Sequence, residues 1–561
     1  MSYRLAIAIS GAVSLGSYEA GVLYEIIRAI GAHNERVTDP EERIEIDVLT
    51  GASAGGMTAA IVAQKLLLDQ DALQEPLDNA LYNPWVRDID IRELLVEHPE
   101  DNPSNAIFSG AVIARLAEQH FLAPLDGRTL SGRHPAAGPQ VHLGLALSNL
   151  VGIDYQIPTF QHSDLLRPAD GFAYRRFEDK LLATITPATT DRAFWSQIAA
   201  AARACGAFPF AFPAVEVPRR LDEPAYTLSG SRLVDWSPHS GRFTYTDGGV
   251  FNNYPLGMAK QLANLVDTEP NDYTRRFYLY VSPWGRGRQE VSTFTAEEAS
   301  IPQTAKALLG AIYQQAGFQD WIATDRYNEL VACFDERAYA LRDAVAHMPP
   351  AERGHLHTLS AGFLDALYPE NDDQRTRDYA RLRAQFMVGT EAEALLADHG
   401  EPAVEAWIRA VQVLERAAGL GNKDILTVYT ITAGDEELAS EGMHAFAGFF
   451  DRAFRDYDYN AGRRKARQFI EALLALRADP AKAAGHLPLQ PGEAPPPLPA
   501  QDESLRHAQM RDIDPGARRH LAERFGDRAE RTLRQLGVNW VLRRILMSFV
   551  LKKRIRAFLD L

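Results

Sequence analysis

The order of apolar and polar positions in the first 70 residues predicts alternating buried strands and helices. Residues 5–10 form one nearly continuous apolar run, which is typical of a strand buried on both faces of an α/β sheet. After a glycine-containing loop, apolar side chains recur at helical spacing from Tyr18 to Ile30. A second aliphatic run at residues 44–49 is followed by an apolar helix at residues 57–68. The pattern therefore predicts an α/β sheet in the N-terminal part of the chain.

The pattern is looser between residues 69 and 139, where polar segments surround one predicted helix at residues 111–121. We interpret residues 69–139 as an insertion that covers the sheet. Strand character returns at residues 141–147 and again at residues 277–281. These runs extend the predicted sheet domain to about residue 300.

Beyond residue 300 the apolar positions follow mainly helical spacing. Helical faces are predicted at residues 305–312, 323–341 and 391–416, and a strand at residues 425–431. Prolines are frequent from residue 488 to 499, which is typical of an extended linker. We therefore divide the chain into a sheet domain at 1–300, a mainly helical region at 301–485, a proline-rich linker at 486–504 and a helical segment at 505–561.

The composition is that of a globular protein, with 46% hydrophobic and 24% charged residues among 561. The formal net charge of −15 argues against a nucleic-acid-binding surface, because phosphate contacts need a basic patch. Two cysteines, Cys205 and Cys333, are too few for a disulfide framework or a cysteine metal site. The N-terminus runs straight into the first strand, and no apolar run reaches the roughly 18 to 20 residues of a membrane span. We therefore expect a cytoplasmic protein.

The C-terminal segment, residues 541–556, is basic and apolar although the chain as a whole is acidic. On a helix, one face would carry Leu542, Ile545, Leu546 and Phe549. Lys552 and Lys553 return to that same face, so the segment is not cleanly amphipathic. Two interpretations stay open, namely peripheral contact with a membrane and a terminal helix packed on its own domain.

The candidate chemistry begins at residues 50–56, Thr-Gly-Ala-Ser-Ala-Gly-Gly, between the second predicted strand and its helix. A G-x-S-x-G sequence at a strand-to-helix turn is the nucleophile-elbow pattern. Serine in so sharp a turn takes a strained backbone conformation, and Gly51 and Gly55 are small enough to let strand and helix pack. The helix N-terminus behind Ser53 favours negative charge beside its hydroxyl. The pattern favours Ser53 as a nucleophile, with a plain glycine-rich turn as the alternative.

The loop after the first strand, residues 11–16, precedes a helix start and so predicts an anion site made of backbone N–H groups. A Walker P-loop needs Gly-Lys-Ser/Thr at its end, and no lysine follows Gly16. A dinucleotide fingerprint needs glycine where this chain has Val13. An oxyanion hole needs only N–H donors beside the nucleophile, and it fits best because the next strand ends at Ser53.

Two further stretches are informative. Residues 247–249, Asp-Gly-Gly, permit a tight turn and a close backbone approach to another group, or else a surface turn between two strands. Phe208, Phe210 and Phe212 alternate with other residues in a stretch that contains Pro209 and Pro213, and we expect them to fill the core rather than to line an apolar groove.

Together these motifs resemble the patatin-like phospholipases over about residues 4–285. The resemblance rests on the glycines of the first loop, the elbow and the later segments Gly21-Val22-Leu23, Ala201-Ala202-Arg203-Ala204, Asp247-Gly248-Gly249 and Asn252-Asn253-Tyr254-Pro255. It implies a three-layer α/β/α fold with a Ser–Asp dyad. The region after residue 300 resembles the C-terminal extension of some bacterial patatin-like proteins.

The resemblance also assigns roles to individual residues. Ser53 is the implied nucleophile and Asp247 the implied base, while the implied oxyanion hole is formed by Gly11, Ala12, Val13 and Ala54. The implied reaction releases fatty acid from a lipid ester, phospholipid or lysophospholipid, without a metal or cofactor.

The first loop departs from the family pattern. That pattern usually reads Gly-Gly-Gly-x-Arg/Lys-Gly, whereas residues 11–16 here read Gly-Ala-Val-Ser-Leu-Gly. Backbone N–H donors survive these changes, but a position with positive φ accommodates Val13 only at a cost in free energy, and the basic side chain is lost.

Two other functions are compatible with the motifs. An α/β-hydrolase with a Ser–His–Asp triad would add His355 or His357, but it would place several strands before its nucleophile. A non-catalytic lipid-binding or scaffold protein would keep the fold without the chemistry. The sequence makes no prediction of lipid head group, acyl length or oligomeric state.

Overall fold

The computed structural model describes most of the chain. The described residues are 2–96, 98–102, 105–127, 129–159, 169–227, 232–233, 241–267, 275–284, single positions and pairs between 295 and 329, 333–368, 372–387, 389–417, 427–434, 437–441, 445, 447–478, 485–507, 512–535, 537–545, 547 and 552–558.

One mixed sheet lies at the centre of the molecule, and its described strands follow the order β5-β7-β3-β2-β1-β8-β9. The strands from β3 to β9 in this order are parallel to their neighbours. β4, β6 and β7 pair antiparallel with β3, and β5 pairs antiparallel with β7. The strands are β1 (Tyr3–Ile9), β2 (Ile44–Gly51), β3 (Ala137–Thr159), β4 (Ala169–Ile185), β5 (Val215–Pro218), β6 (Arg232–Leu233), β7 (Arg242–Thr246), β8 (Arg276–Ser282) and β9 (Val428–Thr432).

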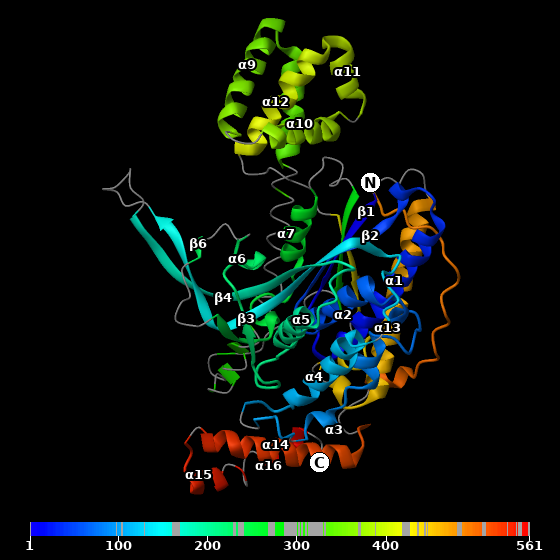
Figure 1. The fold of residues 1–561 in the computed structure, drawn as a ribbon, viewed down its shortest axis with the longest axis vertical. Coiled ribbons are helices and arrows are strands. Elements are labelled where there is room, and N and C mark those ends of the chain that lie inside the picture. Colours follow the sequence, from blue (N-terminus) through cyan, green and yellow to red (C-terminus); the bar gives the residue numbers. More distant parts are fainter. Residues whose placement is uncertain are drawn as a thin grey trace.

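Helices cover both faces of the sheet, which confirms the predicted α/β/α fold. α1 (Gly16–Arg36), α2 (Ala54–Leu68) and α5 (Arg192–Cys205) lie over one face, and α7 (Leu256–Val266) lies over the other (Figure 1). β8 is buried along its whole length, because it has helices on both sides. The short helix α6 (Pro224–Thr227) lies beside β4.

Several predicted elements are confirmed, and some are divided differently. The helix predicted at residues 111–121 is α4 (Gly110–Ala117), continued by a π-turn to Leu122. The helix predicted at residues 391–416 is two helices, because Gly400, with a φ of 74°, interrupts it. The strand predicted at 425–431 is β9. The face predicted at 305–312 and the part before residue 333 of the face predicted at 323–341 lie almost entirely outside the described residues, whereas residues 333–341 are helical.

A group of helices beyond residue 330 has its own apolar core. It contains α9 (Pro350–Leu367), α10 (Asp372–Phe386), α11 (Thr390–His399) and α12 (Glu401–Ala417). Trp407 is fully buried in this core, and its indole N–H donates to the carbonyl of Ala338 at 2.9 Å. Figure 1 shows the group at one end of the molecule, apart from the sheet.

The long helix α13 (Arg452–Ala478) packs against α1 at backbone contact distance. A Cβ at Gly462 would lie 2.1 Å from the carbonyl oxygen of Tyr18, and a Cβ at Gly21 would lie 1.9 Å from the carbonyl oxygen of Tyr459. Only glycine fits at either crossing position. The two helices therefore approach more closely than larger side chains would allow.

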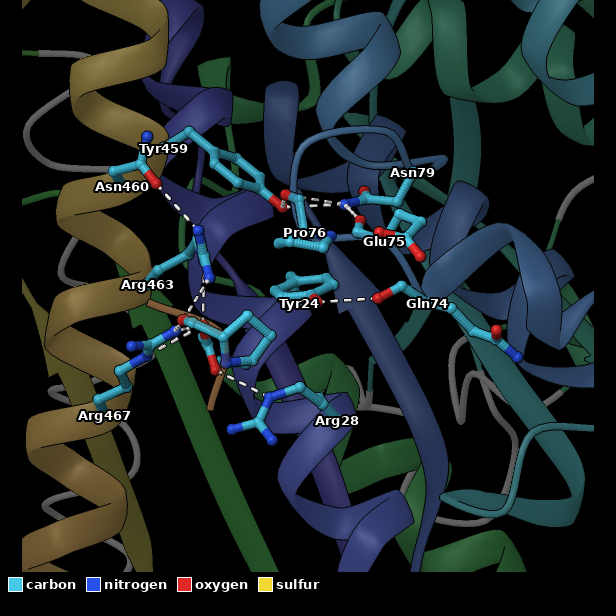
Figure 2. A network of polar contacts seen from close by, with 12 residues as sticks. Tyr24, Arg28, Gln74, Glu75, Pro76, Asn79, Tyr459, Asn460, Arg463 and Arg467 are labelled. Carbon is cyan, nitrogen blue, oxygen red and sulfur yellow. Dashed lines mark hydrogen bonds and ion pairs between the residues drawn. The ribbon is translucent and has the colours of Figure 1, made fainter. Parts of the chain in front are cut away.

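A buried polar network joins the same two helices (Figure 2). The carboxylate of Glu25 on α1 is fully buried and accepts hydrogen bonds from Arg28, Arg463 and Arg467, at 3.1, 3.0 and 2.5 Å. Tyr459 extends the network to the insertion, because its hydroxyl donates to the carbonyl of Pro76 at 3.0 Å. Removing the Glu25 carboxylate would leave the buried Arg463 without its ion-pair partner, and breaking a buried ion pair in this way typically costs about 3–5 kcal/mol.

Residues beyond the boundary that we placed at residue 300 thus contribute to the sheet domain. β9 pairs in parallel with β8, and α13 packs on α1. The proline-rich segment contains no helix or strand between residues 485 and 502, and it lies against the same two helices. Arg467 donates to the carbonyl of Pro496 at 2.6 Å, and Leu487 and Leu489 are buried. The domain division itself remains a prediction.

The insertion and the C-terminal helices share a second apolar cluster. α3 (Ile91–Leu94) and α4 supply buried side chains, and α14 (Pro515–Gln535) covers them with Leu521. Ile555 of α16 (Lys552–Phe558) packs on this cluster, while Trp540 at the start of α15 (Trp540–Ile545) is 65% exposed. The described part of the C-terminal segment is thus packed on its own chain, and Leu546 and Phe549 lie outside the described residues.

None of the described helices combines the length and the apolar composition that crossing a bilayer requires. Peripheral membrane contact through the C-terminal segment stays a prediction.

The glycine crossing makes a stability prediction. Gly462→Ala should lower the free energy of unfolding by roughly 1–3 kcal/mol, because α1 and α13 must move apart to accommodate the methyl group. Gly362→Ala in α9 is the matched control, since no atom lies within 4 Å of the place its methyl group would take and alanine favours helix by up to about 1 kcal/mol. Urea denaturation of both variants measures the difference. Equal effects of the two substitutions would contradict the close helix crossing.

Candidate active site

Ser53 lies at the turn where β2 ends and α2 begins. Its backbone has φ 51° and ψ −126°, a combination that costs a non-glycine residue about 1–3 kcal/mol. The residue is 6% exposed. The strain and burial are those expected of a nucleophile elbow, in which the side chain projects from a sharp strand-to-helix turn.

Two glycines leave room for this turn. A Cβ at Gly51 would lie 2.3 Å from the carbonyl oxygen of Gly55, and a Cβ at Gly55 would lie 2.3 Å from the carbonyl oxygen of Ser10. Backbone atoms cannot yield as a flexible side chain can, so a side chain at Gly51 would push β2 and α2 apart, and one at Gly55 would push α2 away from the end of β1. The sequence requirement for small residues therefore has a direct steric cause.

Asp247 follows β7 and faces Ser53. The Ser53 hydroxyl donates a hydrogen bond to Oδ2 of Asp247 at 2.6 Å. The N–H of Gly249 donates to Oδ1 at 2.7 Å, which fixes the orientation of the carboxylate. The fold thus brings together two predicted site residues that lie almost 200 positions apart in the chain.

The surroundings of Asp247 shift its acidity. The side chain is 1% exposed, and burial raises its pKa to about 7, although the hydrogen bonds from Ser53 and Gly249 act in the opposite direction. No cation is among the groups that shift this pKa. A carboxylate with a pKa near neutrality is suited to accept a proton at working pH.

The loop predicted as an oxyanion hole lies directly beside Ser53. A Cβ at Gly11 would lie 2.9 Å from Cβ of Ser53 and 2.0 Å from Oδ1 of Asn253. The N–H of Gly11, however, donates to the carbonyl of Asn253 at 3.2 Å, so it is already engaged. This contact corrects the part of the prediction that counted Gly11 among the available donors.

The other three predicted donors are not engaged in this way. No hydrogen bond from the backbone N–H of Ala12, Val13 or Ala54 to another protein group exists within the described residues. Ala54 begins α2, where the first N–H groups of a helix lack intrahelical acceptors. These three N–H groups remain candidates for an oxyanion hole.

Val13 has a positive φ of 53°, which is rare for a β-branched residue. Neighbouring hydrogen bonds hold the loop in this shape, since the N–H of Ser14 donates to the carbonyl of Ala445 at 3.1 Å and that of Leu15 donates to Ala12 at 2.9 Å. The strain anticipated for a valine at this position is therefore present.

The histidines considered for a triad lie elsewhere. His355 and His357 are in α9, and His357 pairs with Glu405 of α12 at 3.5 Å. Among the described residues, none of those lining the pocket at Ser53 is a histidine, and no group of three or more His, Cys, Asp or Glu side chains could hold a metal ion.

Comparison with known proteins gives one family match and one curated relative. The family model of patatin-like phospholipases matches residues 7–260, a range that contains both Ser53 and Asp247. Residues 7–260 form a patatin-like phospholipase domain.

A curated relative is similar over a longer range. "Uncharacterized protein y4iI" of Sinorhizobium fredii is 25% identical over 445 aligned residues, which cover 65% of this chain and 60% of the relative. The alignment thus spans less than two thirds of that relative's length.

A pocket opens beside Ser53 in the patatin-like domain. Its walls come from the loop at Val13, the elbow, the insertion and the segment after α5. Phe208 and Phe212 line it, while Phe210 is 71% exposed, so these aromatic residues border a groove rather than only fill the core. Phe449, from the region beyond residue 300, closes one side.

A second, apolar pocket adjoins the first. Five residues line both: Met57, Trp85, Ile89, Ile113 and Arg203. The second pocket continues between the insertion and α5, where Phe121, Leu116 and Ala199 form its walls. The two pockets together provide an apolar space that extends from Ser53.

Sequence reasoning missed the insertion residues and Arg203 as parts of this site. Trp85 and Ile113 lie in a stretch without a recognisable motif, so only packing brings them to Ser53. Arg203 belongs to one of the segments that carry the family resemblance, but nothing local assigns it a place in the pocket. Asn253 likewise follows the Asp-Gly-Gly turn, and its contact with Gly11 depends on the tertiary fold.

The strained loop of the patatin-like domain makes a second prediction. Val13→Gly should be more stable than Val13→Ala by about 0.5–1 kcal/mol, because both lose the valine contacts and only glycine relieves the positive φ. Urea denaturation of the two variants measures the order. Ala361→Gly in α9 is the control. There, the change from alanine to glycine should instead lower the free energy of unfolding by up to about 1 kcal/mol. Greater stability of Val13→Ala would contradict a strained residue 13.

Proposed function

We propose that the protein is a serine acyl hydrolase that releases fatty acid from a lipid ester, such as a phospholipid or lysophospholipid, through a Ser53–Asp247 dyad. The observation that carries the proposal is the 2.6 Å hydrogen bond from the Ser53 hydroxyl to a buried, cation-free Asp247 carboxylate. The apolar pockets beside Ser53 support an acyl chain as the bound group.

In the first step, Oδ2 of Asp247 accepts the proton of the Ser53 hydroxyl while Oγ attacks the ester carbonyl carbon. The carbonyl oxygen becomes an oxyanion, for which the N–H groups of Ala12, Val13 and Ala54 are the proposed donors. The tetrahedral intermediate then expels the alcohol, which takes the proton from Asp247. The products of this half-reaction are the acyl-enzyme and the free alcohol.

In the second step, Asp247 accepts a proton from water, and the resulting hydroxide attacks the acyl-enzyme carbonyl. Collapse of the second intermediate releases the fatty acid and returns the proton to Oγ of Ser53. Neither step requires a metal or a cofactor in this proposal.

A second candidate function is lipid binding without catalysis. The strain at Val13 favours it, because a distorted loop would hold the oxyanion poorly. Labelling of Ser53 by a fluorophosphonate probe distinguishes the two, since only an activated serine reacts.

The dyad predicts strongly non-additive mutant effects. Ser53→Ala and Asp247→Asn should each lower ester hydrolysis by several orders of magnitude, and the double variant should be little worse, because proton transfer needs both partners. Asp247→Asn keeps the size of the side chain, so circular dichroism should show a folded protein. Strictly additive losses, or a histidine whose removal is as damaging as Ser53→Ala, would contradict the dyad.

The acidity of Asp247 predicts a pH dependence. Only its carboxylate can accept the serine proton, so the rate of fluorophosphonate labelling should rise about tenfold per pH unit well below its pKa of about 7 and level off above it. The rate is measured from pH 5 to 9 on the native protein. Asp247→Asn is the control, since it should label slowly and without this inflection. A flat profile for the native protein would argue against Asp247 as the base.

A further inference from the structure

Arg203 lies near the C-terminal end of α5 and lines both pockets. It is the one charged side chain among the described residues that line the pocket at Ser53. In the second pocket the other titratable group is His120, which pairs with Asp88 at 2.7 Å. The apolar space beside Ser53 therefore contains a single cation at the junction of its two parts.

The guanidinium of Arg203 has no partner in the described protein. Among the described residues, none makes a hydrogen bond, ion pair or aromatic ring contact with Arg203, although it is half-buried. Burial alone lowers its pKa, and no carboxylate acts on it. Asp247 does not serve as its counter-ion, because burial and hydrogen bonds account for the pKa of that carboxyl.

Two buried arginines elsewhere in the chain show the contrast. Arg219 pairs with Asp179 at 3.0 Å, and Arg276 binds Asp267 at 2.6 Å. Partial desolvation of a charge without a compensating partner is unfavourable, so an anion that supplied the partner would bind favourably there. The missing partner of Arg203 would be an anion that enters the pocket with the substrate.

We infer that Arg203 binds the phosphate of the substrate, which makes the substrate class a phospholipid or lysophospholipid rather than a neutral glyceride. This inference rests on the proposed function. A guanidinium matches a phosphate with two parallel N–H···O hydrogen bonds, which a lysine ammonium cannot reproduce. A phospholipid also carries its acyl chain a few bonds from its phosphate, so one molecule would fill the apolar pockets and pair with Arg203.

The first test compares two substrates with the same acyl chain, a lysophosphatidylcholine and a monoacylglycerol. Arg203→Met should lower kcat/KM for the phospholipid roughly 10- to 100-fold and for the monoacylglycerol less than about threefold. The kcat/KM of Arg203→Lys for the phospholipid should fall between that of the native protein and that of Arg203→Met. Arg192→Met is the matched control on the same helix, because Arg192 lies at the surface and pairs with Glu118 at 2.6 Å; it should leave the preference unchanged.

Equal losses on both substrates would overturn the inference, because they would show that Arg203 only shapes the pocket wall. The inference would also be overturned if free fatty acid inhibited Arg203→Met less than the native protein while the preference for the phospholipid stayed intact. The anion bound by Arg203 would then be the product carboxylate.

The second test separates this inference from the proposed function. A non-hydrolysable ether lysophospholipid and the matching alkylglycerol are titrated into Ser53→Ala by calorimetry. Tighter binding of the phospholipid, lost when Arg203→Met is added, supports the inference even if the native protein hydrolyses no ester. Equal affinity for the two ligands in Ser53→Ala would overturn it.

Discussion

Only Ala52 and Ser53 separate the end of β2 from the start of α2, and the surrounding backbone leaves no space for a side chain at Gly51 or Gly55. The position of every other site group follows from this turn. The loop at Gly11 lies against Cβ of Ser53, and Asp247 reaches the hydroxyl from the end of β7. A strain of about 1–3 kcal/mol at one residue persists only because strand, helix and loop together leave it no alternative.

The region beyond residue 300 helps to hold this arrangement. Ala445 accepts the hydrogen bond from Ser14 in the strained loop, and Phe449 closes one side of the pocket. α13 packs on α1, the helix that continues directly from the same loop, through the glycine crossing and the Glu25 network. The C-terminal half therefore contributes to the shape of the candidate site as well as covering the sheet.

Two groups at the candidate site are without an opposite charge among the described residues, namely Asp247 beside Ser53 and Arg203 in the wall of the pocket. Asp247 has no cation to lower its pKa, which suits a base, and Arg203 has no anion, which suits a binding group. If the two formed an ion pair, the pKa of Asp247 would fall and its basicity would be lost. Because the two groups do not form an ion pair, Asp247 can serve as the proposed base and Arg203 can bind the proposed phosphate.

The sequence by itself determined the local features. The apolar runs predicted β1 and β2, the G-x-S-x-G pattern predicted the turn at Ser53, and the resemblance to a family implied Asp247. These succeed because a buried strand, a sharp turn and a glycine requirement are each set by neighbouring residues. Val13 could likewise be recognised as a strained position from its residue type.

Only the tertiary structure decided the features that depend on distant contacts. The engaged N–H of Gly11 depends on Asn253, and the pocket walls at Trp85 and Phe449 come from segments without a motif. The attachment of β9 and α13 to the sheet domain, and the unpaired state of Arg203, likewise follow from packing. The physical reason is that hydrogen-bond satisfaction and desolvation are set by whatever surrounds a group in space, and chain order alone does not specify those neighbours.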